Sequence, residues 1–358
     1  MNPGVDTAPP EQNKRKEGER SMSYADKVFK DVLNDILENG TSDHMYPVRP
    51  RWDDGEPAHT IAKFGVTTRY DLSKNFPLIT LRNPYLKSAV DEMLWIWQKK
   101  SNNTHDLKSH VWDQWADEDG SIGKSYGYQQ AKFYKYNGIT PEHLKKAFPG
   151  IMGGVLKREC RNELNSFGFG YLAYGYDYTP DRSGLGFIGH PIAFDVEDQF
   201  YMTQIDKVIY DLVNNPASRR MYVTMWNPSE LCEMALEPCA HSMNFNVVGN
   251  KLNGMLLQRS QDFLTAFAWN ECQYAALTLA LSTIYGFEPG EFMHVVTNCH
   301  IYDRHIPIAQ KLAASDEHDE PIVRVNPEIK NFYDLTPQDF IVENYTCNPF
   351  TDKIPVAV

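Results

Sequence analysis

The sequence predicts an α/β protein of the α+β type, and three observations lead to this prediction. Residues 241–249 (HSMNFNVVG) and 250–260 (NKLNGMLLQRS) have the pattern of the two arms of a β-hairpin. Residues 271–292 contain a long helix that is apolar on nearly every side, which is typical of a helix buried at the centre of a domain. Two further segments, 24–39 and 202–214, have the apolar spacing of amphipathic helices.

Composition limits the class of protein. The chain has 358 residues, of which 42% are hydrophobic, so it can bury a substantial core. A net charge of -12 argues against a nucleic acid as substrate, although an anionic small molecule needs only a local cluster of arginines. Six cysteines without CxxC spacing predict no disulfide framework and no metal site, and they favour a reducing, cytoplasmic compartment. No segment predicts a membrane span or the apolar core of a signal peptide.

The chain begins with a polar and charged stretch. Residues 1–22 are rich in Pro, Gly, Lys and Glu, and this composition predicts a disordered tail. A helix follows from Ser23 and stops at Gly40. Residues 44–72 then have the composition of a loop that leads into a strand.

Glu92 lies in the next predicted helix, which begins near Lys87. The apolar stripe of this helix is formed by Ala89, Met93, Leu94 and Trp97. An exposed glutamate is the ordinary alternative, but the apolar neighbours of Glu92 favour partial burial. Burial raises the pKa of a carboxyl group toward values that suit proton transfer near neutrality.

The middle of the chain is less informative. Trp112 and Trp115 lie in the polar loop 111–129, and taken alone they are compatible with a small satellite core. Residues 131–203 are rich in Tyr, Phe and Gly with many turn signals, which favours an ordered aromatic lobe over a disordered linker. No function can be read from this lobe.

Cys239 is a candidate nucleophile because it follows a proline and an acidic residue in a polar run. A thiolate is the reactive form, and a neighbouring cation favours it by lowering the thiol pKa. Arg259, on the return arm of the predicted hairpin, is a plausible cation. The alternative is a buried structural cysteine, which is where free cysteines usually lie.

The order and spacing of the segments around Cys239 resemble those of the thymidylate synthase family. The segments are NPASRR (215–220), MALEPC (234–239), LLQRSQD (256–262), AWNECQYA (268–275) and NCHIYDRH (298–305). The resemblance is close over 23–130 and 204–358, and it is absent over 1–22 and about 131–203.

This resemblance implies an architecture and a reaction. The expected fold is a mixed sheet around a long buried helix, in one catalytic domain over 23–358 with an insertion at about 131–203. A homodimer through the sheet face is expected. The implied reaction is reductive methylation of dUMP to dTMP, with 5,10-methylenetetrahydrofolate as donor of the carbon and the hydride and with no metal.

The resemblance also implies roles for individual residues. The catalytic group comprises the nucleophile Cys239, the general acid–base Glu92, Tyr126, Asp262 and the ring-reading Asn270. The substrate-binding group comprises Arg49 (with Arg51 as the alternative), Arg219, Arg220, Gln258, Arg259, Ser260, Asn270, His300 and Tyr302. The folate-binding group comprises Arg82, Trp112, Trp115, Asp262 and Val358. Arg219 and Arg220 are expected to enter the site of the partner chain.

Several positions depart from the usual family pattern. Ala240 and Asn298 replace a usual histidine and aspartate, with His241 one place later, and Ala266 and Ala268 replace a glycine and a proline. The loop around Arg49 also lacks the common RTGTGT form and resembles a less common branch. Two alternatives therefore remain open: a pyrimidine-nucleotide 5-hydroxymethylase that finishes with water, and a non-catalytic nucleotide- or RNA-binding homologue. Joint retention of the catalytic group argues against the second.

Overall fold

The structure is a computed structural model that describes residues 22–148, 172–174, 179–180, 187–188, 193–196 and 199–358. The predicted disordered tail lies outside the described residues apart from Met22. Much of the predicted insertion also lies outside them, so its identity as an insertion stays a prediction.

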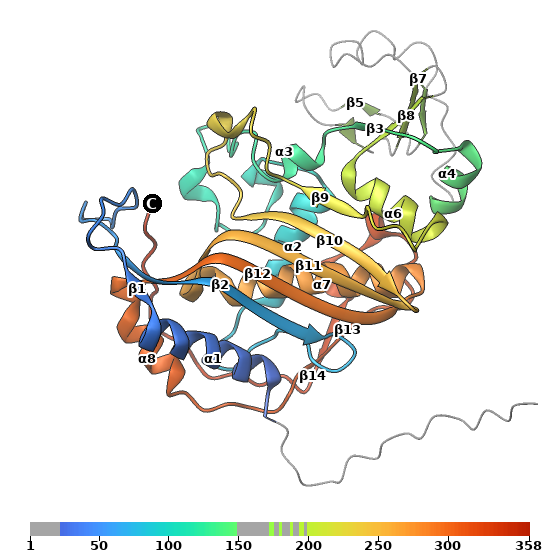
Figure 1. Cartoon of the computed structure of the whole chain (residues 1–358). Coiled ribbons are helices and arrows are strands. Elements are labelled where there is room, and N and C mark those ends of the chain that lie inside the picture. The colour runs from blue at the N-terminus through green and yellow to red at the C-terminus, as the bar shows by residue number, and fades with distance from the viewer. Residues whose placement is uncertain (1–21, 149–171, 175–178, 181–186, 189–192, 197–198) are drawn as a thin grey trace, which may run out of the picture.

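A six-stranded sheet organises the chain (Figure 1). Its order is β1 (Thr41–Ser42), β2 (Thr60–Asp71), β12 (Glu288–Tyr302), β11 (Lys251–Asp262), β10 (Ala240–Val248) and β9 (Tyr222–Thr224). β11 and β12 run parallel and the other neighbours run antiparallel, so the predicted mixed sheet is confirmed. β10 and β11 form the predicted hairpin, turned at Gly249 with a φ of 61° that favours glycine.

The long apolar helix α7 (Ala268–Tyr285) is buried against one face of this sheet, as predicted (Figure 1). The approach is so close that a Cβ atom on Gly254 would lie 2.2 Å from Thr278 Oγ1. α7 ends at Gly286 in the left-handed conformation. Helix α2 (Leu86–Trp97) packs on α7, where the rings of Trp97 and Tyr274 lie 6.0 Å apart.

The two predicted amphipathic helices are present. α1 (Tyr24–Asn39) is capped by Ser23, whose hydroxyl accepts from the Asp26 amide, and it ends at Gly40. α6 (Gln204–Asn214) is capped by Thr203. The described ranges also contain shorter α-helices, of eight or fewer residues each: α3 (Gly127–Gln130), α4 (Pro141–Ala147) and α8 (Ile306–Ala313).

Smaller sheets surround the central one. The described part of 131–203 contributes to a four-stranded sheet of β3 (Tyr134–Tyr136), β8 (Gln199–Met202), β7 (Ala193–Val196) and β4 (Leu172–Tyr174). Two-stranded pairs are β5 (Thr179–Pro180) with β6 (Phe187–Ile188), and β13 (Ile322–Val325) with β14 (Phe340–Glu343). Within the described ranges, no helix has the length and apolar character needed to cross a membrane.

Candidate active site

The sheet register gathers the predicted site residues at one end of three strands. Cys239 immediately precedes β10, and its neighbour Ala240 pairs with Gln258 on β11. Toward the end of β11, Ser260 pairs with Asn298 of β12, and Asp262 pairs with His300 of the same strand. Residues 18 and 38 positions apart in the sequence therefore become neighbours.

Two groups hold the loop that carries Cys239. The Cys239 amide donates to the Tyr126 hydroxyl at 3.0 Å, and the Arg259 amide donates to the Cys239 carbonyl at 3.0 Å. The Arg259 guanidinium donates to the Glu237 carbonyl at 2.7 Å and to the Pro238 carbonyl at 3.2 Å. The loop is therefore fixed from both sides.

The predicted cation acts on the thiol and lowers its pKa, as expected, but the net shift of that pKa is upward. Burial raises the pKa of Cys239, and the positive charges of Arg259 and Arg49 offset only part of that increase. The net pKa lies above its ordinary value, so the resting form is the thiol. A proton must leave Cys239 before or during attack.

Tyr126 has an unusual backbone conformation, with φ of 42° and ψ of -101°. Such a conformation is rare for a bulky residue, and strain of this kind collects at functional sites. It brings a buried hydroxyl onto the Cys239 loop. Burial first, and then the neighbouring Cys239, raise the pKa of Tyr126 well above its ordinary value, so the hydroxyl keeps its proton.

Glu92 is buried in α2, with only 5% of its surface exposed. Its two carboxyl oxygens accept from the Trp112 indole at 3.0 Å and from the Trp269 indole at 2.7 Å. Burial raises the pKa of Glu92, and these two donors limit the increase. The partial burial expected from the sequence is present.

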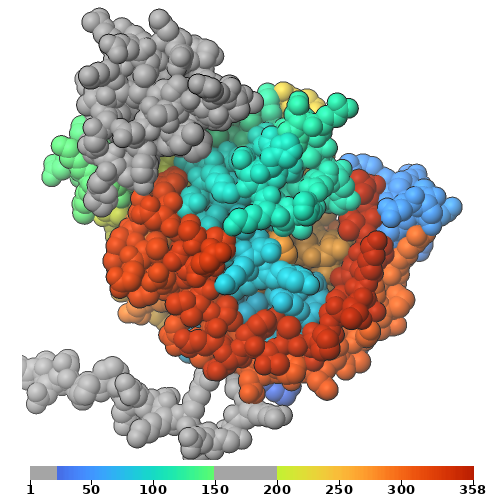
Figure 2. Space-filling view, turned by 180° about the vertical axis from the view of Figure 1, so that it is seen from behind, coloured from blue at the N-terminus to red at the C-terminus, as the bar shows by residue number. Residues whose placement is uncertain are grey.

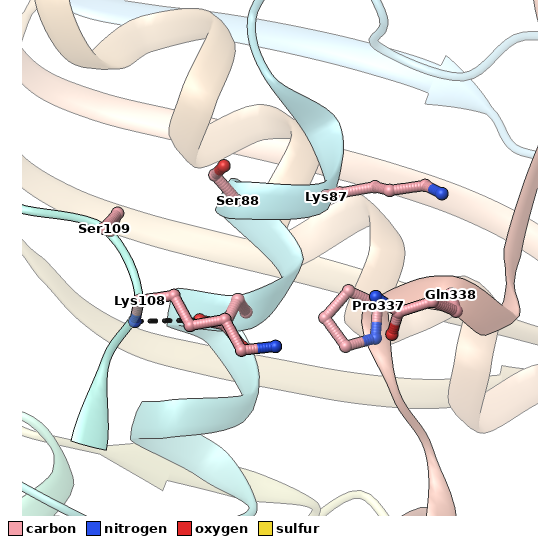
Figure 3. A pocket seen from close by; sticks show the side chains of 7 residues that line it. Lys87, Ser88, Lys108, Ser109, Pro337 and Gln338 are labelled. Carbon is pink, nitrogen blue, oxygen red and sulfur yellow. Dashed lines mark hydrogen bonds between the residues drawn. The ribbon is translucent and has the colours of Figure 1, made fainter.

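An aromatic wall stands next to Glu92. The Trp112 ring lies 5.5 Å from that of Trp115 and 5.1 Å from that of Tyr126. A cavity of about 170 Å³ lies between α2, the loop before Trp112 and Pro337 (Figure 3). Its lining includes two basic residues, Lys87 and Lys108, and one acidic residue, Asp91.

Asp262 organises the connection from β11 to α7. Its carboxylate accepts from the amides of Leu264 and Thr265, which belong to a π-helical turn, Phe263–Phe267. Arg82 is buried behind this turn and donates to the Leu264 carbonyl at 2.6 Å. The partners of Asp262, chiefly His305, outweigh its burial and lower its pKa.

The Asn298 departure keeps a partner for His300. Asn298 Oδ1 lies 2.8 Å from His300 Nδ1, so an amide oxygen replaces the usual carboxylate oxygen as acceptor. The His300 and Tyr302 rings meet edge to face, 5.1 Å apart. Burial lowers the pKa of His300.

The C-terminal tail closes one side of the site. Val358 exchanges two backbone hydrogen bonds with Arg51, of 2.8 and 3.0 Å, and His305 Nε2 lies 2.7 Å from the Pro355 carbonyl. In Figure 2 a hollow lies between this red tail, the blue loop near residue 50 and the blue-green segments from α2 to about residue 130. The orange central elements form its floor.

Three side-chain amides, from Gln258, Asn270 and Gln273, form a hydrogen-bonded row between β11 and α7. Gln258 Nε2 donates to Asn270 Oδ1 at 3.4 Å, and Asn270 Nδ2 donates to Gln273 Oε1 at 2.9 Å. Gln273 in turn lowers the pKa of Glu92. On the far side, Gln258 Oε1 lies 2.7 Å from His294 Nε2.

Sequence reasoning missed Trp269, Gln273 and His294. Trp269 could have been found from the sequence, because it directly precedes Asn270 and so lies in the same first turn of α7. His294 had none, because its strand position and its partner from another strand become visible only in three dimensions.

Arg219 and Arg220 do not join the other site residues in the single chain. Both are exposed, in the loop between α6 and β9. The register that pairs Tyr222 with Asn244 sets Arg220 opposite Asn246. That position is about 20 Å along β10 from Ala240 at 3.3 Å per residue.

The cysteines of the described ranges are free thiols. Those ranges contain no cluster of three or more His, Cys, Asp or Glu side chains that suits a metal ion.

Comparisons with known proteins agree with this geometry. A family model described as thymidylate synthase matches residues 27–358. Thymidylate synthase 1 of Bacillus subtilis (strain 168) is 32% identical over 328 residues, covering 90% of this chain and 96% of that protein. The thymidylate synthase of Clostridium beijerinckii is 31% identical over 329 residues, covering 90% of this chain and 95% of that protein.

A solved structure agrees as well. Thermostable thymidylate synthase A from Bacillus subtilis superposes with a TM-score of 0.71 at 31% identity, covering 93% of this chain and 99% of that one. The resemblance and the fold class expected from the sequence are both confirmed. The chain belongs to the thymidylate synthase family, methyltransferases that transfer a one-carbon unit to dUMP.

Proposed function

We propose that this protein converts dUMP to dTMP by reductive methylation, with 5,10-methylenetetrahydrofolate as co-substrate. The observation that carries the proposal is the Cys239 loop, held by Tyr126 and Arg259 in the same site as the buried carboxyl group of Glu92. A thiol nucleophile and a carboxyl group with a raised pKa are the two groups that addition to a uracil ring requires.

The protein side chains divide the work as follows. Cys239 Sγ adds to C6 of the ring and makes C5 nucleophilic. Glu92 then moves protons on and off the adduct, because its raised pKa lets it act in both directions. When bound, the folate supplies the one-carbon unit and the hydride that completes the methyl group. Elimination of the Cys239 thiolate releases the product.

The residues around the hollow suit a folate. The indole faces of Trp112 and Trp115 offer flat surface for a fused ring. Lys87 and Lys108, at the nearby cavity, provide positive charge for the carboxylates of the glutamate portion (Figure 3). Asp262 and Arg82 would support the turn beneath the folate, and Val358 would cover it.

The substrate phosphate is assigned to arginines. Arg259 and Ser260 lie beside Cys239 on β11, and Arg49 is favoured over Arg51. The charge of Arg49 acts on both Cys239 and Tyr302, whereas Arg51 pairs with Val358 through its backbone. We assign the sugar hydroxyl to His300 and Tyr302 and the uracil edge to Asn270, with Gln258 behind it.

We further propose a homodimer through the open face of the central sheet. Residues with even numbers on β11 face α7, so Met255 and Leu257 lie on the opposite face, paired with Met293 and Val295. An apolar strip of this kind on an uncovered face favours a partner. Such a dimer would let Arg219 and Arg220, which are remote from their own Cys239, bind the substrate of the partner chain.

We also propose a cytoplasmic location, because the cysteines of the described ranges are free thiols.

Release of tritium from [5-³H]dUMP with the folate, together with product mass and dihydrofolate absorbance, tests this function. The expected products are dTMP and dihydrofolate. Cys239→Ser should lose turnover by several orders of magnitude and still bind dUMP. The exposed Cys232 offers the matched control, because Cys232→Ser should keep full turnover. Near-normal turnover in Cys239→Ser would refute the assignment of the nucleophile.

The hydroxymethylase is the second candidate, and Ala240 is the observation that favours it. Ala240 is a small, buried apolar side chain next to Cys239, so it supplies no polar group at the position where the family usually has a histidine. A 5-hydroxymethyl nucleotide formed without dihydrofolate would establish this candidate instead.

A further inference from the structure

Two buried residues behind the site, Glu271 on α7 and His294 on β12, take no part in the chemistry described above. Their exposed surfaces are 1% and 0%. Glu271 Oε1 lies 3.5 Å from His294 Nδ1. A buried acid beside a buried base is costly unless both are satisfied, so their partners define what the pair does.

Glu271 is held as a hydrogen-bond acceptor. Thr68 Oγ1 donates to its Oε1 at 2.5 Å, and the Tyr70 hydroxyl donates to its Oε2 at 2.8 Å. Each oxygen of the Glu271 carboxyl group therefore has its own hydroxyl donor, which fixes the side chain in place. Glu271 also fixes the place of the His294 ring, whose Nδ1 faces Glu271 Oε1.

The orientation of Gln258 is fixed by a group that can only accept. Gln258 Nε2 lies 3.2 Å from the Ser260 carbonyl oxygen, and its second hydrogen points to Asn270 Oδ1. If the amide were turned over, two oxygens would face each other at that carbonyl. Gln258 Oε1 must then face His294, whose Nε2 donates to it at 2.7 Å.

The orientation of the Gln258 amide in turn fixes that of the Asn270 amide. Its Oδ1 accepts from Gln258 and its Nδ2 donates to Gln273. One lone pair of the oxygen and one hydrogen of the nitrogen remain for a ligand. This pair accepts from N3–H and donates to O4 of uracil, whereas cytosine presents the reverse pattern at these two positions.

We propose that Glu271 and His294 are positioning residues, which hold the amides of Gln258 and Asn270 in the orientation that reads uracil and rejects cytosine. The inference rests on the proposed function, because it concerns the ring of the proposed substrate. It adds that selectivity for the ring is set by two residues that the ring does not touch.

The test compares dUMP with dCMP as substrates for three variants of the full-length protein. His294→Leu removes the donor to Gln258, and His294→Gln restores an N–H donor. Thr278→Val is the control, because Thr278 is buried on the same helix but its hydroxyl bonds only to the Tyr274 carbonyl. The measured quantity is the ratio of kcat/KM for dUMP to that for dCMP, alongside the melting temperature.

His294→Leu should lower this ratio about tenfold or more, as expected when a buried polar partner is removed. The loss should lie mainly in the KM for dUMP, because the amides contact the ring before the chemical step. His294→Gln should recover most of the ratio. Thr278→Val should keep the ratio of the unmodified protein even where its melting temperature falls.

A wild-type ratio in His294→Leu, or a loss of equal size in Thr278→Val, would overturn the inference. If the leucine variant does not fold, Glu271→Gln takes its place, since the amide keeps the shape and removes the charge. A wild-type ratio in that variant would also overturn the inference. An unmodified protein that does not act on dUMP would refute the proposed function itself, which is a different result.

Discussion

At the scale of single residues, Glu92 shows how burial and hydrogen bonding together set a functional pKa. Burial raises the pKa of its carboxyl group above the ordinary value of 4.5, while the indole donors of Trp112 and Trp269 hold it down. If the carboxylate is the form that accepts a proton, kcat falls as pH drops through this raised pKa. The acid limb of the kcat profile should therefore lie above pH 4.5.

Trp269→Phe removes one donor to the carboxylate, so the pKa of Glu92 should rise further. The acid limb should move to higher pH, which a kcat profile measured across the acidic range would detect. Glu92→Gln should lower kcat about 10²–10⁴-fold and abolish the limb. Trp97→Phe is the matched control, because Trp97 lies on α2, as Glu92 does, and its ring packs on Tyr274. A shift in Trp97→Phe equal to that in Trp269→Phe would contradict the assignment.

Residues with chemical character of their own could be predicted from the sequence, and residues defined by their partners could not. Cys239, Glu92 and Arg259 stand out by type and neighbourhood. His294 lies in an ordinary strand pattern, and only its distance of 2.7 Å from Gln258 gives it a role. The pKa of Cys239 was wrongly expected to be lowered, because the sequence shows the cation and does not show how deeply the thiol is buried.

At the scale of elements, strong periodicity predicted α7 and the β10–β11 hairpin correctly. The π-helical turn Phe263–Phe267 was not predicted, because it depends on the Asp262 carboxylate bonding to the following amides rather than on apolar spacing. The 15-residue β12 was not predicted either, because its segment NCHIYDRH was noted only as a site motif.

A buried ion pair joins the segment just after α2 to α6. Lys100 Nζ lies 2.9 Å from Asp206 Oδ2, and Asp206 also accepts from Thr203 and Tyr333. Lys100→Met should cost about 3–5 kcal/mol in free energy of unfolding, because it leaves the Asp206 charge buried without its cation. Urea denaturation measures this cost. The double variant with Asp206→Asn should recover part of it, and a double variant no more stable than Lys100→Met would contradict the explanation.

The C-terminal tail is the element expected to exclude water. Its end is held by two backbone hydrogen bonds between Val358 and Arg51. Deleting Val358 removes both bonds, so water should reach the reactive C5 substituent more often. The fraction of 5-hydroxymethyl product, measured by mass spectrometry, should rise. An unchanged product ratio would show that another element excludes the water.

At the scale of the whole molecule, the proposed dimer would bring two arginines of one chain to the site of the other. Arg259 and Tyr126 contact the Cys239 loop, and Trp112 contacts both Tyr126 and Glu92. Arg219 and Arg220 lie exposed near the far end of β10. The apolar strip containing Met255 and Leu257 supplies a surface through which a second chain could bring these arginines in. Sequence spacing alone could not distinguish this arrangement from a solvated pair of arginines.

Subunit complementation tests the shared site. Arg219→Ala and Cys239→Ser chains should each be inactive as homodimers, yet their hybrid should contain one site free of both changes. Random exchange in an equal mixture makes half the dimers hybrid, so tritium release should return to about a quarter of the unmodified rate. Glu92→Gln with Cys239→Ser is the control, because both changes lie in the same chain's site and every hybrid site keeps one defect. If the first mixture stays inactive after subunit exchange, Arg219 acts within its own chain. If both mixtures recover, the changes do not act through a shared site at all.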